Sequence, residues 1–133
     1  MSQCDKNKLQ TMEQRRAQYA LREIEPLQKK DEKTQKELRG LLHSLPALIH
    51  MNGLGQALAF CCMKDKGKKD SAHWLAYEMI GGWLHQQGIL GERDALRAIA
   101  AGDMPHYMAA TTEAQALLQW LKKFATAYLK SDD

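Results

Sequence analysis

The stretch TTEAQALLQWLKKFA, residues 111–125, decides the fold class because its apolar residues recur with the period of an α-helix. One face of this helix collects Leu117, Leu118, Leu121, Phe124 and Ala125. Trp120 falls about 100° from Leu121 around the same helix, and Lys122 and Lys123 continue around the other flank. We therefore predict a helix with one face in the core and a second face of mixed character.

The helical period recurs along the rest of the chain, whose 133 residues suit one ordinary domain. No stretch alternates apolar and polar side chains as a half-buried strand does, valine is absent and isoleucine is scarce. We therefore expect an all-α fold, in which five or six helices form a single compact bundle that spans residues 1–133. Residues 1–7 are expected to be flexible, and residues 131–133 are expected to form a tail. The predicted helices cover residues 8–29, 31–45, 54–65, 72–87, 92–101 and 104–130.

Proline and glycine mark where these helices bend, end or meet a neighbour. Pro26 lacks a backbone N–H and should kink or end the first helix, and Pro46 should interrupt the second. The Asn-Gly pair at 52–53 predicts a turn. Gly81 and Gly82 lie inside a predicted helix, where each costs about 1 kcal/mol. We therefore expect a neighbouring segment to pack against their bare backbone.

The chain has three cysteines, Cys4, Cys61 and Cys62, and this odd number with two adjacent members is not a disulfide framework. The opening MSQCDKNKLQ lacks the apolar segment of a signal peptide. No apolar run approaches the roughly 18 residues of a membrane span. These features favour a reduced, cytoplasmic location without a membrane partner.

No set of residues has the spacing of a catalytic or metal site. The five histidines are scattered, without an HExxH or CxxC pattern. Cys61 and Cys62 could in principle meet His73, but they are more simply interpreted as small hydrophobic residues of the core. GLGQAL at 53–58 has two glycines but no preceding strand, so a dinucleotide site is not indicated, and no GxSxG is present. We therefore expect no catalytic residues, no metal and no cofactor.

The positions of the basic residues are more informative than the net charge, which is only +3. Such a charge permits a nucleic-acid partner without requiring one. Lys64, Lys66, Lys68 and Lys69 crowd into one predicted loop. This loop is either simply solvated or a mobile segment that contacts phosphates.

Arg16 and Trp120 each depart from the pattern of their helix. Arg16 lies within the apolar stripe of the first helix, as does Glu13. It either pairs with Glu13 or directs its charge into a groove that a partner occupies. Arg15 and Arg22 lie on the outer face and would add to a basic surface. Trp120 shares its face with alanines and could widen the core, anchor a protein contact or stack a nucleobase.

Four stretches of the chain resemble one family. They are RRAQYA at 15–20, LPALIHMNGLGQALAF at 45–60, HWLAYEM with Trp74 and Tyr77, and YMAATTEAQALLQWLKKFA at 107–125. Together they resemble, over residues 9 to 129, the small subunit of the type III-B CRISPR effector, the Cmr complex. The second and fourth of these stretches are the more specific ones.

The resemblance implies an all-α, non-catalytic structural subunit of an RNA-targeting ribonucleoprotein that acts in antiviral defence. Its implied partners are the crRNA, the target RNA and other Cmr subunits, including copies of itself. RNA would be held through its backbone, because the guide supplies sequence specificity. Trp120 becomes a candidate for the subunit interface. The candidate RNA-binding residues are Arg15, Arg16, Arg22, Lys64, Lys66, Lys68, Lys69, Lys122 and Lys123. The alternative is a helical protein–protein scaffold that makes no direct contact with RNA.

Overall fold

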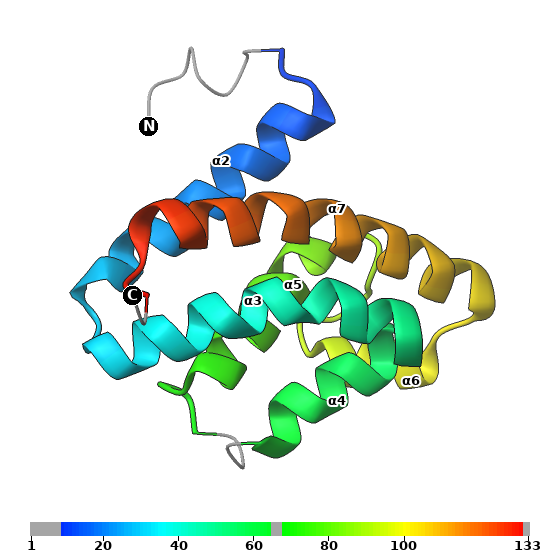
Figure 1. Ribbon diagram of the computed structural model, residues 1–133. Coiled ribbons are helices and arrows are strands. Elements are labelled where there is room, and N and C mark those ends of the chain that lie inside the picture. Colours follow the sequence, from blue (N-terminus) through cyan, green and yellow to red (C-terminus); the bar gives the residue numbers. More distant parts are fainter. Residues whose placement is uncertain (1–8, 65–67, 132–133) are drawn as a thin grey trace.

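The computed structural model describes residues 9–64 and 68–131, and every regular element within these ranges is a helix (Figure 1). The predicted all-α class is therefore confirmed. In chain order the elements are α2 (Met12–Ile24), the 3₁₀ helix η1 (Glu25–Lys29), α3 (Glu32–Asn52), α4 (Leu54–Lys64), α5 (Ala72–Gln86), α6 (Ala95–Ala101) and α7 (Met104–Tyr128). The expectations for residues 1–7, for Cys4 and for Lys66, and most of the predicted tail, lie outside the described residues.

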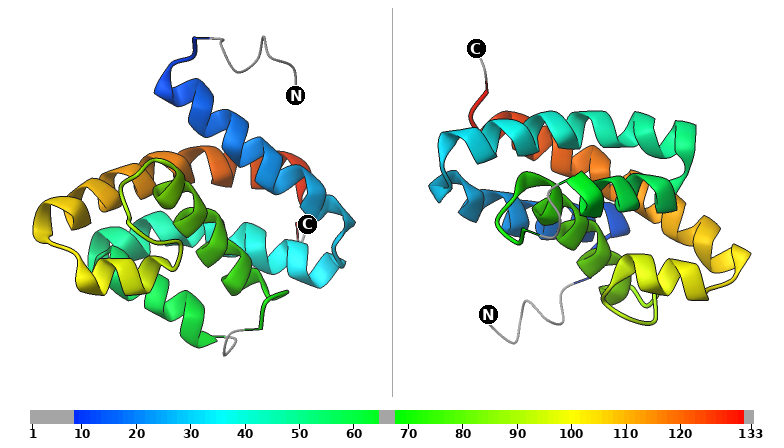
Figure 2. Two further views of the ribbon diagram at one scale, coloured as in Figure 1. Left: turned by 180° about the vertical axis from the view of Figure 1, so that it is seen from behind. Right: turned by 90° about the horizontal axis from the view of Figure 1, so that it is seen from below.

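Helix α7 lies between α2 and α3 and packs along both of them (Figures 1 and 2). Helix α5 supports α3 and α7 from the inside, and α4 and α6 pack against α5 to complete the bundle. The apolar stripe predicted for the last helix is confirmed, because Leu117, Leu118, Leu121 and Ala125 are fully buried and Phe124 packs against them. None of the described helices is both long and apolar enough to span a membrane.

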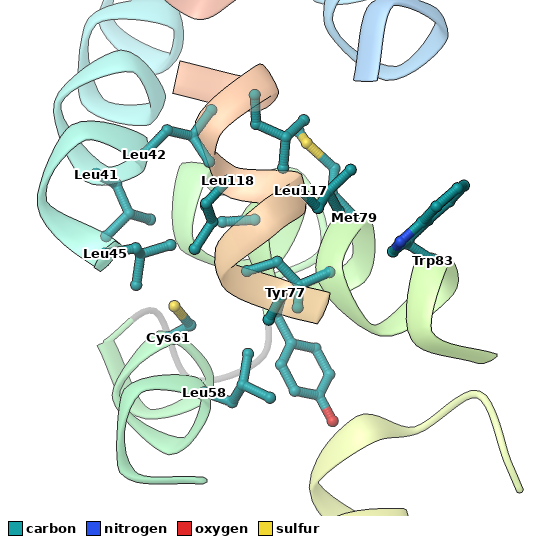
Figure 3. Close-up of a cluster of buried hydrophobic side chains, with 14 of the residues drawn as sticks. Leu41, Leu42, Leu45, Leu58, Cys61, Tyr77, Met79, Trp83, Leu117 and Leu118 are labelled. Carbon is teal, nitrogen blue, oxygen red and sulfur yellow. The ribbon is translucent and has the colours of Figure 1, made fainter. Parts of the chain in front are cut away.

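The core collects buried side chains from all six described α-helices, and those labelled in Figure 3 come from α3, α4, α5 and α7. Leucine is the commonest of these residues, and its branched side chain fills the space between crossing helices. The residues labelled in the figure are Leu41, Leu42, Leu45, Leu58, Cys61, Tyr77, Met79, Trp83, Leu117 and Leu118. Each of these helices therefore depends on the others to keep its apolar face away from water.

Helix α2 begins later than predicted. Thr11 is its N-cap: the Thr11 hydroxyl accepts a bond from the Gln14 amide, and the Gln14 side chain accepts one from the Thr11 amide, which is a complete capping box. The first helix was predicted from residue 8, but Leu9 lies before this cap and is 97% exposed, so the predicted start is wrong. The α-helix gives way to η1 at Glu25, next to Pro26, as predicted.

Helix α3 continues through Pro46, so the prediction that this proline interrupts the helix is wrong. A proline inside a helix costs about 3 kcal/mol. Leu45 precedes it and Ile49 follows it, and both belong to the buried face of α3. Ending the helix at Pro46 would move Ile49 out of the core, so tertiary packing prevails over the local cost.

The predicted turn at 52–53 is confirmed, and it is fixed by Tyr107 of α7. Gly53 ends α3 with φ at +91°, a conformation that favours glycine. A Cβ atom on Gly53 would lie 2.9 Å from the Tyr107 hydroxyl oxygen. The same hydroxyl accepts a hydrogen bond of 3.0 Å from the Gly55 amide at the start of α4.

Gly81 and Gly82 meet close neighbours, as expected from the sequence. A Cβ atom on Gly81 would lie 3.2 Å from the Cβ of Ala95, the first residue of α6. A Cβ atom on Gly82 would lie 2.9 Å from the hydroxyl oxygen of Tyr19 on α2. The bare backbone of α5 is therefore the surface on which α2 and α6 approach.

Candidate nucleic-acid and subunit interface

Arg16 is held by two carboxylates of its own chain. Its Nε and Nη2 donate to the two oxygens of Glu113 over 2.6 and 2.9 Å, and its Nη1 donates to Glu13 over 2.6 Å. The side chains of Arg16 and Glu113 are only 17% and 12% exposed. Of the two sequence interpretations of Arg16, the Glu13 pair is the one observed. Glu113, 97 residues away, is a partner that the sequence did not reveal.

Two tryptophans complete this polar network between helices. The indole N–H of Trp83 on α5 donates to Glu113 over 2.9 Å, and that of Trp120 on α7 donates to Glu13 over 3.1 Å. The hydrogen bonds from Arg16 lower the pKa of Glu113 and, reciprocally, raise the pKa of Arg16. Both charges are therefore retained at neutral pH, and the network joins α2, α5 and α7.

Trp120 packs within its own bundle. Its ring centroid lies 5.9 Å from that of Phe124, and its side chain is partly buried against the core. Among the three interpretations from the sequence, a widened core face is the one that these contacts support. A role for Trp120 at a subunit interface stays a prediction.

Arg15 and Arg22 are exposed on the outer face of α2, as predicted. They line an open groove of about 260 Å³ between α2 and the end of α5. Glu23 lines the same groove, and burial raises its pKa. This groove therefore carries charges of both signs.

The lysines of the 64–69 segment lie elsewhere on the molecule. Lys64, Lys68 and Lys69 are exposed, and Lys66 lies outside the described residues. Figures 1 and 2 place the end of α4 on the opposite side of the bundle from the start of α2. The predicted cations therefore do not form a single face.

Lys122 and Lys123 lie on α7, where Lys123 is exposed and Lys122 is partly buried. Thr126, one turn further on, donates its hydroxyl proton to the Lys122 carbonyl oxygen over 2.9 Å. The Thr126 hydroxyl oxygen also lies 2.6 Å from Nε2 of His43 on α3. The Thr126 side chain, one turn from Lys122, therefore joins α7 to α3.

Sequence reasoning missed the contact that His43 makes with α7 and the partial burial of Arg39 one turn earlier on α3. The Nε atom of Arg39 is buried, and no hydrogen-bond partner for it lies in the described part of the chain. The sequence did contain one signal of a locally positive net charge in these two helices. Residues 38–52 and 114–131, which include the facing parts of α3 and α7, contain no aspartate or glutamate.

The cysteines have the character of core residues. Burial raises the pKa of Cys61 to about 12 and also raises the pKa of Cys62. Both thiols are therefore protonated at neutral pH, which makes them poor nucleophiles and poor metal ligands. Among the described residues, no group of three histidine, cysteine, aspartate or glutamate side chains could hold a metal ion.

Comparisons with known proteins agree with the resemblance seen in the sequence. Residues 12–128 match the family described as "CRISPR-associated protein (Cas_Cmr5)". The chain is 35% identical over 98 residues to the "CRISPR system Cmr subunit Cmr5" of Thermus thermophilus, and this match covers 71% of this chain and 76% of that protein. It also matches the crystal structure of a CRISPR-associated Cmr5 family protein from Thermus thermophilus, with 29% identity and a TM-score of 0.72. That match covers 91% of this chain and 100% of the other.

Proposed function

This chain belongs to the Cmr5 family of CRISPR-associated proteins, and we propose on that basis that it is a structural, non-catalytic subunit of a CRISPR type III-B (Cmr) ribonucleoprotein. In this role it packs on neighbouring subunits, including copies of itself, and helps to hold the crRNA and its target RNA through backbone contacts. The complex acts in antiviral defence, and the cytoplasmic location expected from the sequence remains part of the proposal.

The observation that supports the RNA contact is the contrast between Arg16 and the lysines of α7. The charge of Arg16 is compensated by Glu13 and Glu113 within the fold. No described carboxylate lies within ion-pair distance of Lys122 or Lys123. Recognition of an RNA backbone requires cations that are not already neutralised by the protein. We therefore retain Lys122 and Lys123, with the exposed Arg15, as candidate contacts and leave Arg16 out.

A non-catalytic role agrees with the chemistry of the described side chains. The two thiols are held in their protonated form, and the strongest polar cluster, around Arg16 and Glu113, is largely buried. A catalytic group must reach a substrate. The two thiols and the Arg16–Glu113 cluster instead contribute to the packing between helices.

The test uses the reconstituted complex with a tagged version of this subunit. Charge reversal by Arg15→Glu, Lys122→Glu and Lys123→Glu is expected to leave the fold intact and to reduce the crRNA and target RNA retained after affinity purification. Arg97→Glu is the matched control, because Arg97 is exposed on α6 and is not among the candidate contacts. Undiminished RNA retention by the triple variant would contradict the proposed RNA contact.

A helical scaffold without RNA contact remains the second candidate, and the exposed methionines favour it. Met51, Met63, Met104 and Met108 are large apolar side chains left on the surface, and flexible methionines suit adaptable protein contacts. Under this alternative, Met104→Gln with Met108→Gln prevents incorporation into the complex, whereas charge reversal changes nothing. Trp120→Ala is a poor test of this alternative, because Trp120 also supports the fold.

A further inference from the structure

A small pocket lies between α5 and the segment that leads into α6. It has a volume of about 270 Å³ and is lined by Trp74, Tyr77, Glu78, Arg93 and Asp94. We call it the Trp74 pocket. Sites for drug-sized molecules span roughly 300–1,000 Å³, so this pocket suits a single side chain better than a larger ligand. None of the candidate RNA contacts retained above lines it.

One wall of the pocket is aromatic. The ring centroids of Trp74 and Tyr77 lie 5.2 Å apart, with 38° between the ring planes. Tyr77 is only 3% exposed, whereas Trp74 is partly exposed and lines the pocket. An accessible indole face is the aromatic surface that attracts a cation most strongly.

A carboxylate without a cation lies opposite this wall. The Tyr77 hydroxyl points out of the core toward the start of α6 (Figure 3), donates to Oδ1 of Asp94 and accepts a bond of 2.9 Å from the Leu96 amide. Asp94 is the N-cap residue of α6, yet its side chain makes no capping bond. No basic side chain in the described part of the chain lies within ion-pair distance of Asp94. Tyr77 therefore orients an anion that the fold itself does not neutralise.

Glu78 adds a second carboxylate, which Arg93 neutralises only weakly. Glu78 Oε2 lies 3.8 Å from Arg93 Nε, and the two side chains are 39% and 70% exposed. An ion pair that is so long and so exposed contributes little. The Nη2 atom of Arg93 lies 3.6 Å from the position of a Cβ atom on Gly82, which also approaches Tyr19 of α2. The guanidinium of Arg93 therefore extends toward α2 and does not pair with Asp94.

We infer that the Trp74 pocket receives an arginine side chain from the surface of a neighbouring protein subunit. The guanidinium stacks on Trp74 and pairs with Asp94, while Glu78 adds to the negative potential of the pocket. A planar guanidinium can stack on an indole and donate two parallel N–H groups to a carboxylate, which an ammonium group cannot do. This inference rests on the proposed function and deepens it, since it gives the chemistry of one contact with a partner subunit.

A guanine base is the competing ligand, because it also stacks on aromatic rings and donates N–H groups to a carboxylate. A nucleotide brings a phosphate with its base. Glu78 and Asp94 line the pocket, and Glu92 lies two residues before Asp94. These three acidic residues would repel a phosphate. The charges therefore favour arginine, and the nucleotide becomes an outcome of the test.

The test titrates the ¹⁵N-labelled full chain with the tripeptide acetyl-Gly-Arg-Gly-amide and follows the indole N–H signals by NMR. The Trp74 signal, assigned with Trp74→Phe, is expected to shift in a saturable way. The signals of Trp83 and Trp120 serve as internal controls, because both N–H groups bond carboxylates elsewhere in the fold. The citrulline tripeptide, which has the same shape without the charge, should bind about tenfold more weakly. The lysine tripeptide should bind several-fold more weakly.

A matched pair of variants tests the role of Asp94. Asp94→Asn keeps an oxygen that can accept from Tyr77 but removes the charge, so the arginine tripeptide should bind about tenfold more weakly. Glu92→Gln removes the same charge from a residue that does not line the pocket, and it should leave the affinity unchanged. The amide signal of Leu96 reports whether the Tyr77 bond is retained in each variant.

Three outcomes would overturn the inference. The first is the absence of any shift of the Trp74 signal at about 20 mM arginine tripeptide, which is well above the dissociation constant of a weak site. The second is binding of the citrulline or lysine tripeptide as tight as that of the arginine tripeptide. The third is tighter binding of guanosine monophosphate, which would assign the pocket to a nucleobase.

These outcomes are separate from those of the proposed function. The RNA-retention experiment changes Arg15, Lys122 and Lys123, none of which lines the Trp74 pocket. Failure of the tripeptide to bind would therefore leave the RNA result as it stands. Arginine binding together with undiminished RNA retention by the triple variant would instead support the Trp74 pocket and contradict the proposed RNA contact.

Discussion

Arg16 of α2 and Glu113 of α7 meet through two parallel N–H···O bonds of 2.6 and 2.9 Å, although 97 residues separate them in the chain. Both side chains are largely buried, and the remaining Arg16 nitrogen bonds Glu13. This pair fixes the position of the first described helix on the last one. Disruption of this pair should therefore lower the stability of the fold rather than the affinity for RNA.

Arg16→Met should lower the free energy of unfolding by about 3 kcal/mol, because it leaves the Glu113 carboxylate buried without its cation. The double variant Arg16→Met with Glu113→Leu should recover part of that loss, since no unpaired charge remains. Urea unfolding measures both values, with the exposed Glu25→Gln as a control that changes stability by less than about 0.5 kcal/mol. Strict additivity of the two single losses would contradict the coupling described here.

Glu113 should also make stability depend on pH. Hydrogen bonds from Arg16 and Trp83 keep the pKa of Glu113 below its ordinary value of 4.5. A carboxyl group with a lowered folded-state pKa contributes stability above its unfolded pKa and loses it as the pH falls through the folded value. The stability difference between the wild type and Glu113→Gln should therefore be constant from pH 7 to about pH 5 and shrink below about pH 4. If the stability difference between the wild type and Glu113→Gln grew as the pH fell, the lowered pKa of Glu113 would be contradicted.

The thiol of Cys61 should be nearly inert in the folded protein. With a pKa of about 12, only on the order of 1 in 100,000 molecules carries the thiolate at pH 7. In a Cys4→Ser background, iodoacetamide labelling followed by mass spectrometry should modify Cys62 slowly and Cys61 only after urea is added. Labelling of native Cys61 at the rate of a free thiol would show that α4 does not pack as described.

Two glycine-to-alanine changes should have opposite effects. Gly82→Ala puts a Cβ atom 2.9 Å from the Tyr19 hydroxyl, which itself donates to the Met79 carbonyl oxygen over 2.7 Å. We expect a loss of about 1–3 kcal/mol from this overpacking. Gly40 lies inside α3 with open space around it, so Gly40→Ala should stabilise the protein by about 0.5–1 kcal/mol. Thermal unfolding of the pair measures both signs against the same wild type, and equal shifts would refute the argument.

The sequence predicted the elements well wherever a local signal determined them. The Asn-Gly pair at 52–53 and the glycine pair at 81–82 mark a turn and a close approach, because both depend on backbone properties that a single residue carries. The prediction failed at Pro46, where burial of Leu45 and Ile49 outweighs the local preference of proline. It also failed at the start of the first helix, which the cap at Thr11 determines and periodicity alone does not locate.

The candidate site was predicted less well, because it depends on which helices become neighbours. Periodicity placed Arg16 on the inner stripe of its helix, but only the packing of α2 on α7 brings Glu113 to it. The same limit applies to His43, whose contact with Thr126 depends on the packing of α3 on α7.

The position of α7 between α2 and α3 has a consequence for the order in which the chain can fold. Both of those helices are synthesised long before α7, yet α2 packs mainly against it, and α3 packs against it as well as against α4 and α5. The core therefore cannot close on the ribosome until α7 has emerged. Contacts between such distant segments also slow folding. A nascent chain truncated before α7 would expose its leucines, and it would therefore bind chaperones or aggregate.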